Sequence, residues 1–210
     1  MIGRLVGGQV GHLATPGRAW GSLAMLLGLL ALSGWGVPRA AIDWQPTLAL
    51  TQPWRAFSAI GVHYSALHLL ANLAGAAAVG VLGVAARAPG AAAWAWLIAW
   101  PLTQFGLLVE PTLVHYGGLS GVLHAGVAVV AVVLLWPPNA PARRWVGLAL
   151  LAGLAVKVLL EAPWGAPLRH PAGMDVAVAP LAHATGSIAG LLCAVVLQFA
   201  TRTLKGKPAA

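Results

Sequence analysis

The sequence predicts an all-α membrane protein, a single bundle of six transmembrane helices spanning residues 1–210. Hydrophobic residues make up 60% of the 210 residues and charged residues only 8%, whereas about a quarter of the residues in a soluble domain are charged. Six apolar runs approach the ~20 residues that a helix needs to cross a bilayer. The polar stretches between them, of about 20 residues at most, are too short to bury a core of their own.

The six runs differ little in length, and the loops between them are mostly short. We expect helices near residues 20–38, 62–85, 92–109, 118–136, 144–161 and 176–200. No small-residue cleavage site closes the first run, so we interpret it as a retained helix rather than a signal peptide. The long loop, residues 39–61, is too apolar for a solvated linker and is expected to lie partly embedded in the outer leaflet.

Lys and Arg residues predict the orientation, because basic residues concentrate on the cytoplasmic side of a membrane. One side of the bundle receives Arg4, Arg18, Arg87, Arg143, Arg144, Arg202, Lys205 and Lys207. The other side receives Arg39, Arg55 and Arg169 with all four acids, Asp43, Glu110, Glu161 and Asp175. Both termini are therefore expected in the cytoplasm. Topology also explains the net charge of +8 without a nucleic-acid partner.

Two kinds of residue are expected to mark the helix ends. Several tryptophans are predicted to form an interfacial belt, among them Trp20, Trp35, Trp136, Trp145 and Trp164. Lys157 is the one basic residue inside a run, four residues before Glu161. It is expected to pair with that acid or to extend its ammonium group to the membrane surface.

Few polar side chains lie inside the runs, and because such groups are costly in a bilayer each is a functional candidate. They are His63, His68 and Asn72 in the second run (HYSALHLLANL), Ser120 and His124 in the fourth (YGGLSGVLHAG) and His183 in the sixth (AHATGSIAGLL). These three runs cross the membrane in the same direction, and the polar residues lie within ~10 Å of its outer side. They are expected to converge.

Small residues would let Ser120 and His183 meet. Two small-xxx-small pairs are present, Gly117 with Gly121 and Gly186 with Gly190. Such pairs allow close helix contact, although they are also common packing devices. A serine needs an imidazole within hydrogen-bonding distance to lose its proton during attack. The pattern therefore favours a Ser-His dyad.

No acidic third member is expected, because every Asp and Glu is predicted at or beyond the outer surface. His68 and Asn72 share one face of the second helix. Their N–H groups suit a developing oxyanion, together with the backbone N–H of Ser120 at a helix start.

With these residues the chain resembles the rhomboid family of intramembrane serine proteases. Four motifs occur in the family's order: Trp54-Arg55, His63-x4-His68-x3-Asn72, Gly118-x-Ser120-Gly121, and Ala182-His183 followed by Gly186 and Gly190. The motifs cover residues 50–195, and the six-helix topology covers the rest. The resemblance implies that the first motif shapes the membrane-embedded loop.

The resemblance also implies a reaction, the hydrolysis of a peptide bond in or near a transmembrane segment of the substrate, with no metal or cofactor. Ser120 would be the nucleophile and His183 the general base and later acid. His68, Asn72 and the Ser120 amide would be the oxyanion donors. The enzyme would lie in a bacterial inner membrane with its active site toward the periplasm.

His124 departs from a common family pattern, in which an aromatic residue four positions after the serine stacks on the catalytic histidine. An imidazole there could stack on His183, bond to it or share its proton. The short chain, PWR at 53–55 and GLSGVLH at 118–124 resemble the rhombosortase branch. That branch is associated with secreted proteins that carry a C-terminal Gly-Gly sorting tail. A general rhomboid protease with other membrane substrates is the alternative.

Two further hypotheses remain. One is a catalytically silent rhomboid-like protein that binds membrane clients, which usually lacks the serine or the histidine. The other is a metal-handling protein that uses imidazole ligands, namely His63, His68, His124 and His183. The remaining histidines, His12, His115 and His170, are expected to be solvated.

Overall fold

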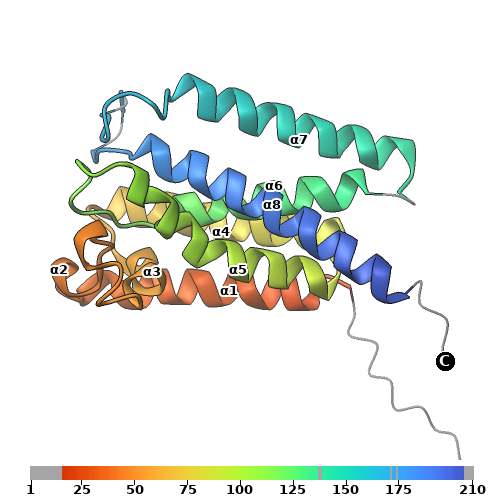
Figure 1. Cartoon of the computed structure of the whole chain (residues 1–210), viewed down its shortest axis with the longest axis horizontal. Coiled ribbons are helices and arrows are strands. Elements are labelled where there is room, and N and C mark those ends of the chain that lie inside the picture. Colours follow the sequence, from red (N-terminus) through yellow and green to blue (C-terminus); the bar gives the residue numbers. More distant parts are fainter. Residues whose placement is uncertain (1–15, 137–138, 171, 174, 206–210) are drawn as a thin grey trace, which may run out of the picture.

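A computed structural model describes residues 16–136, 139–170, 172–173 and 175–205 of the chain. Figure 1 shows six long helices running side by side: α1 (Arg18–Ser33), α4 (Ala66–Ala85), α5 (Gly90–Phe105), α6 (Ser120–Leu135), α7 (Pro141–Leu160) and α8 (Pro180–Lys205). Each overlaps one of the six predicted runs. Among the described residues, β-structure is limited to two isolated bridges.

The long predicted loop is folded into short helical pieces at one end of the bundle (Figure 1). These pieces are η1 (Gly34–Gly36), α2 (Arg39–Ile42), η2 (Pro46–Leu48), α3 (Arg55–Ser58) and η3 (Ala59–Gly61), and a further turn, η4 (Gly106–Val109), ends α5. The start of α1 and the end of α8 lie at the opposite end (Figure 1). Arg4, His12 and Lys207 lie outside the described residues.

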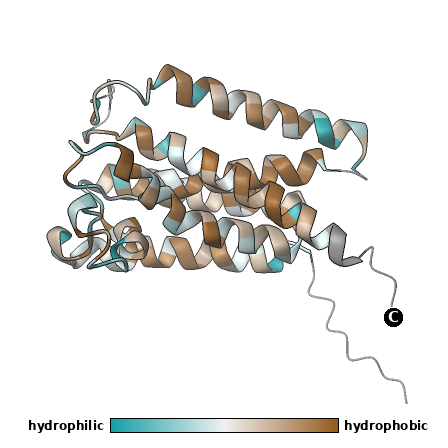
Figure 2. Ribbon diagram, in the orientation of Figure 1, coloured by the Kyte–Doolittle hydropathy of each residue, from teal (hydrophilic) through white to brown (hydrophobic). Residues whose placement is uncertain are grey.

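The helices have the length and apolarity of a multi-pass membrane protein. Four helical segments are long and apolar enough to cross a bilayer, namely Arg18–Gly36, Ala66–Ala85, Gly90–Val109 and Pro180–Thr201. α6 is apolar but has only 16 residues, and α7 carries three basic residues. In Figure 2 the helices are mainly hydrophobic along their lengths, and hydrophilic residues gather toward the ends.

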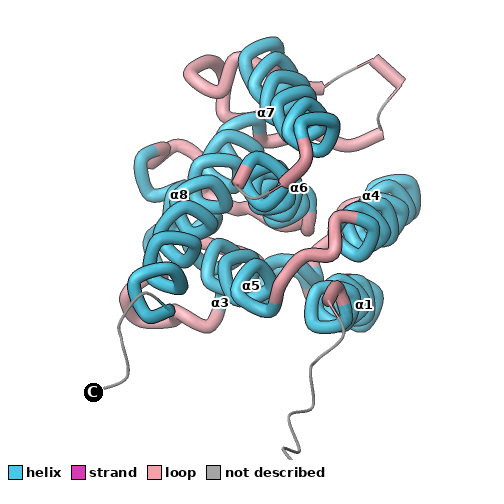
Figure 3. The backbone as a smooth tube through the Cα atoms, turned by 90° about the vertical axis from the view of Figure 1, so that its right-hand side faces the viewer, coloured by secondary structure: helices cyan, strands magenta, loops and turns pink. Residues whose placement is uncertain are grey.

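α6 is the central helix of the bundle. It packs against α4, α5, α7 and α8, and Figure 3 shows it among these helices when the bundle is viewed end on. Its valines and alanines are almost all buried. α7, in contrast, lies on the outside of α6, and Gly147 is its one buried residue. The two neighbouring helices therefore differ greatly in how much of their surface is buried.

Three predicted helices begin later than expected: α4, α6, and α8, which begins at Pro180 rather than near 176. Ser65 caps α4, because its Oγ accepts a hydrogen bond from the backbone N–H of His68 at 3.0 Å. His63, predicted on this helix, is therefore a buried residue of the preceding segment. Gly117 and Gly118 likewise precede α6. At α4, the β-region backbone of the capping serine explains why the apolar pattern alone placed the start too early.

The prediction that Trp20 is an interfacial anchor is wrong. Its side chain is fully buried, stacks on Trp96 with ring centroids 4.4 Å apart, and donates a hydrogen bond to the carbonyl of Val79. The indole therefore fixes α1 against α4 and α5. Trp35, Trp145 and Trp164 are exposed, as an interfacial belt requires.

Candidate active site

Ser120 and His183 are brought together at the start of α6 and the first turn of α8. Ser120 Oγ lies 3.0 Å from His183 Nε2. His183 is 5% exposed, so water competes little for its ring nitrogens. A hydroxyl can donate to an unprotonated Nε2 at this distance, which is the arrangement that activates a serine.

Glycine residues on α6 and α8, which have no side chain, let the two helices come this close. A Cβ atom added to Gly186 would lie 2.0 Å from the carbonyl oxygen of Gly121, and one added to Gly190 would lie 2.3 Å from that of Ala125. The close face of α6 is thus Gly121 and Ala125, whereas Gly117, predicted as part of this face, packs on Val62. We call the contact of these two pairs on α6 and α8 the glycine seam.

His124 stacks on His183, with ring centroids 4.1 Å apart and planes inclined by 10°. Its Nδ1 lies 2.7 Å from the carbonyl oxygen of Ser120. A carbonyl can only accept, so Nδ1 of His124 carries the proton. The imidazole therefore takes the place of a stacking aromatic ring, and its own hydrogen bond fixes it to α6.

Glu161 contradicts the prediction that no carboxylate reaches the dyad. Its Oε2 lies 2.6 Å from Nδ1 of His183, and its Oε1 lies 2.6 Å from Nζ of Lys157. Glu161 follows the last residue of α7, and the end of that helix directs the carboxylate over α8 rather than into solvent. The expected i,i+4 pair with Lys157 is present, but it uses only one of the two oxygens.

The same contacts favour the charged form of Glu161. Burial alone would raise its pKa, but the hydrogen bonds from His183 and Lys157 outweigh burial and lower the pKa to about 2. These contacts therefore favour the ionised carboxylate. An ionised carboxylate accepts the Nδ1 proton of His183, which leaves Nε2 free to accept from Ser120.

The predicted oxyanion donors surround Gly118, two residues before Ser120. A Cβ atom on Gly118 would lie 3.0 Å from Nε2 of His68 and 3.8 Å from Nδ2 of Asn72. The φ angle of Gly118 is +129°, which a side chain would disfavour. Nδ2 of Asn72 is buried and has no hydrogen-bond partner among the described residues. A buried unpaired donor beside the serine is what a developing oxyanion would use.

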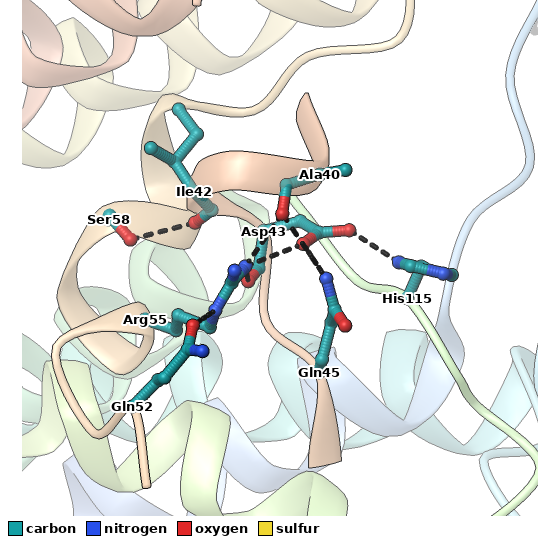
Figure 4. A network of polar contacts seen from close by, with 8 residues as sticks. All are labelled: Ala40, Ile42, Asp43, Gln45, Gln52, Arg55, Ser58 and His115. Carbon is teal, nitrogen blue, oxygen red and sulfur yellow. Dashed lines mark hydrogen bonds and ion pairs between the residues drawn. The ribbon is translucent and has the colours of Figure 1, made fainter. Parts of the chain in front are cut away.

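Arg55, from the first family-like motif, is the centre of a polar network in the long loop (Figure 4). It is 6% exposed, and its Nη1 donates to the carbonyls of Ala40 and Asp43 and to Oδ1 of Asp43, at 2.8 to 3.0 Å. Its Nε donates to Gln52 at 2.6 Å. Trp54 is exposed and takes no part in this network.

The network continues to the strand-like segment that leads to the serine. Oδ2 of Asp43 lies 2.6 Å from Nδ1 of His115, and the backbones of Trp44 and Tyr116 exchange two hydrogen bonds. Asp43 and His115 were predicted at the solvated surface. Asp43 is instead buried, and three side chains satisfy its oxygens, those of Arg55, Gln45 and His115 (Figure 4).

A cavity of about 1050 Å³ opens beside the Ser120–His183 pair, between α4, α6 and α7. Small residues line its facing sides, namely Ala71, Gly75 and Ala78 of α4 and Ala149 and Gly153 of α7. The polar lining is concentrated at one end, where Ser120, His183, His68 and Asn72 meet. We call this cavity the α4–α7 groove.

The histidines do not gather as a metal site. Within the described parts of the chain, no three His, Cys, Asp or Glu side chains lie close enough to hold an ion together. His63 contacts His68 edge to face, with centroids 4.9 Å apart, while His124 and His183 stack through their faces. The in-plane lone pairs of stacked rings do not point at one common point, and a ligand set would require that.

Comparison with known protein families identifies a shared domain. A family model described as the Rhomboid domain matches residues 50–199 of the chain, a range that contains all four motifs and all of α4 to α7. A search of curated proteins found no matching relative.

Proposed function

Because the chain belongs to the rhomboid family, an intramembrane protease family, we propose that it is an active serine endopeptidase that cleaves within or beside a transmembrane segment. The observation that supports activity is the 3.0 Å contact between Ser120 Oγ and His183 Nε2. A silent, client-binding rhomboid-like protein would have no need of this pair. The unpaired donor of Asn72 beside it supports the same proposal.

In the proposed reaction, Ser120 Oγ bonds to the scissile carbonyl carbon as its proton passes to His183 Nε2. Negative charge on the carbonyl oxygen is met by N–H groups of His68, Asn72 and Ser120. His68 Nδ1 faces the backbone N–H of Tyr64 at 3.5 Å, which favours a proton on Nε2. The C–N bond then breaks, and His183 returns the proton to the leaving amine.

Deacylation repeats these steps with water. His183 Nε2 takes a proton from the water as its oxygen bonds to the acyl carbon, and the proton returns to Ser120 Oγ when the ester bond breaks. α6 has 16 residues and so spans ~24 Å, less than the ~30 Å of hydrocarbon in a bilayer. A short central helix supports a serine that lies below the membrane surface and that water reaches from one side.

The α4–α7 groove is the proposed route for the substrate. Its small side chains leave room for an added segment, and its lining is mainly apolar except beside Ser120. A transmembrane segment of a substrate that lay along it would bring its backbone to the serine. We further propose that the groove opens toward the lipid and that the active site faces the periplasm of a bacterial inner membrane, with both termini cytoplasmic.

The finer proposal is a rhombosortase. It is supported by PWR at 53–55 and by GLSGVLH at 118–124. The preferred substrate would be a secreted protein with a C-terminal Gly-Gly motif, an apolar helix and a basic end. If changing Gly-Gly to Val-Val in such a tail leaves the cleavage rate unaltered, the finer proposal is wrong and a general rhomboid protease remains.

The proposed function is tested with purified protein in liposomes and a single-span substrate. We expect the native chain to cleave, and Ser120→Ala and His183→Ala each to lose cleavage by ~10⁴-fold or more while keeping the native melting temperature. A chelator should have no effect. Cleavage by either variant at the native rate would contradict the proposal, and a protein that binds the substrate without cutting it would favour the silent alternative.

A further inference from the structure

We infer that Glu161 is a positioning residue of this site, which holds His183 in the tautomer that can accept the Ser120 proton and stabilises the imidazolium that forms. The inference rests on the proposed function. It turns the expected dyad into a linked series, Ser120 to His183 to Glu161, whose last member comes from α7.

The contacts give each atom one role. His183 has two ring nitrogens, and Nε2 faces Ser120 Oγ at 3.0 Å while Nδ1 faces Glu161 Oε2 at 2.6 Å. Since a carboxylate can only accept, the Nδ1 position carries the proton and Nε2 keeps its lone pair. This is the tautomer that a general base requires.

The carboxylate also matters after the proton has moved. When His183 takes the Ser120 proton it becomes a cation in a site where it is 5% exposed, and an adjacent negative charge lowers the free energy of that state. Glu161 is the one carboxylate that bonds to His183 in the described residues. Its side chain is 25% exposed, so the effect is expected to be smaller than that of a fully buried acid.

Lys157 opposes this effect. Its Nζ lies 2.6 Å from Glu161 Oε1 and 3.5 Å from His183 Nδ1, so it orients the carboxylate while its charge disfavours the imidazolium. The groups that face His183 are Ser120 and His124 from α6, Glu161 and Lys157 from the end of α7, and His68 from α4. Glu161 is the one anion among them.

Glu161 and Lys157 carry opposite charges, and both face His183. Removing each charge in turn gives a test that a purely structural role would not pass. Glu161→Gln keeps the size of the side chain but removes the charge, and its amide can donate to Nδ1 and so favour the wrong tautomer. We expect cleavage to fall ~100-fold and the acid limb of the pH–rate profile to move to lower pH. Lys157→Met removes the opposing charge and should move that limb to higher pH.

The matched control is Glu110→Gln, the same change at an acid whose carboxylate bonds to Thr112 instead; its rate and profile should equal those of the native chain. Glu161→Asp keeps the charge and should recover part of the loss, with the acid limb near its native position. Melting temperatures are measured for all variants. If Glu161→Gln does not fold, Lys157→Met still decides the sign of the pH shift, and Glu161→Asp still tests whether a carboxylate at this position is needed.

Each outcome separates the two proposals. If the native protein cleaves, and Glu161→Gln cleaves within twofold of it with an unmoved acid limb, the role of Glu161 is contradicted while the proposed function stands. Equal shifts in one direction for Glu161→Gln and Lys157→Met would also contradict it. If the native protein itself neither cleaves a substrate nor reacts with a fluorophosphonate at Ser120, the proposed function fails first.

Discussion

The two sides of His183 are held in very different ways. On the α6 side, the glycine seam places backbone against backbone, so that a single methyl group at Gly186 would lie 2.0 Å from a carbonyl oxygen. On the α7 side, Gly147 is the one buried residue of a whole helix, and a cavity of about 1050 Å³ separates the small residues of α4 and α7.

This difference separates two requirements of an intramembrane protease. The proposed nucleophile and base would have to stay within a few tenths of an ångström of their working geometry, and the close backbone contact of the glycine seam would favour that. A transmembrane substrate would need space to enter from the side, and the α4–α7 groove is the proposed route. Glu161 joins the two regions, because it is carried by the loosely packed helix but bonds to the histidine of the seam.

The largest effect is expected from closing the seam. Gly186→Ala must push α8 away from α6, because the new Cβ meets backbone that cannot yield. A displacement of about 1 Å between nucleophile and base costs ~100-fold in rate, so we expect at least that loss of cleavage with a lower melting temperature.

The matched change on the other side is Gly153→Ala in α7, where an added Cβ meets nothing within 4 Å. Its melting temperature should stay the same or rise, since alanine favours helix over glycine by ~1 kcal/mol. Equal losses of stability in the two variants would show that the two sides do not differ as described.

The next effect concerns the first loop, which holds the segment before Ser120. Asp43→Asn removes the charge that pairs with buried Arg55 and contacts His115. We expect a loss of about 2 kcal/mol in the free energy of unfolding and a lower cleavage rate, measured by denaturant titration and by the liposome assay. Glu110→Gln, at a more exposed carboxylate, should change the free energy by less than ~0.5 kcal/mol.

A bulky residue in the α4–α7 groove should slow the entry of a transmembrane substrate without slowing the reaction of Ser120 itself. Gly153→Leu places a branched side chain where Gly153 lines the cavity. We expect cleavage of a transmembrane substrate to fall ~10-fold, because each misplacement of the scissile bond is costly, while a small fluorophosphonate still modifies Ser120 at the native rate. Equal slowing of both reactions would mean that the groove is not the route of the substrate.

The smallest effect is expected at His124. His124→Tyr keeps a flat ring against His183 but loses the hydrogen bond to the Ser120 carbonyl. A ring stack is worth ~0.5–1.5 kcal/mol, so retaining it should keep cleavage within about threefold and leave the pH profile unmoved. A shifted profile would show instead that His124 exchanges protons with His183.

Local sequence patterns were sufficient for the helices and for the convergence of most of the proposed site residues. Apolar runs predicted the six long helices, and the family-like motifs predicted that Ser120, His183, His68 and Asn72 would meet. The contacts that were missed join residues far apart in sequence: Asp43 to His115, and Glu161 to His183. The start of α4 was also misplaced, because Ser65 rather than the apolar pattern determines it.

There is a specific reason why the sequence does not predict the contact between Glu161 and His183. The spacing of Lys157 and Glu161 predicts a pair on one helix face, but no periodicity determines how a helix with one buried residue is rotated against its neighbours. The sequence placed Glu161 and His183 at the same outer end of the bundle, and that shared depth was the available signal. That signal is weak, because an acid at the end of a helix is ordinarily expected to face solvent.

The most direct test of this account is the rate at which a fluorophosphonate modifies Ser120, read by peptide mass spectrometry in native protein, His183→Ala and Glu161→Gln. We predict modification of Ser120 in the native chain, none above background in His183→Ala, and a rate reduced ~100-fold in Glu161→Gln. Modification of Ser120 at equal rates in the native protein and in His183→Ala would contradict activation of the serine by that histidine.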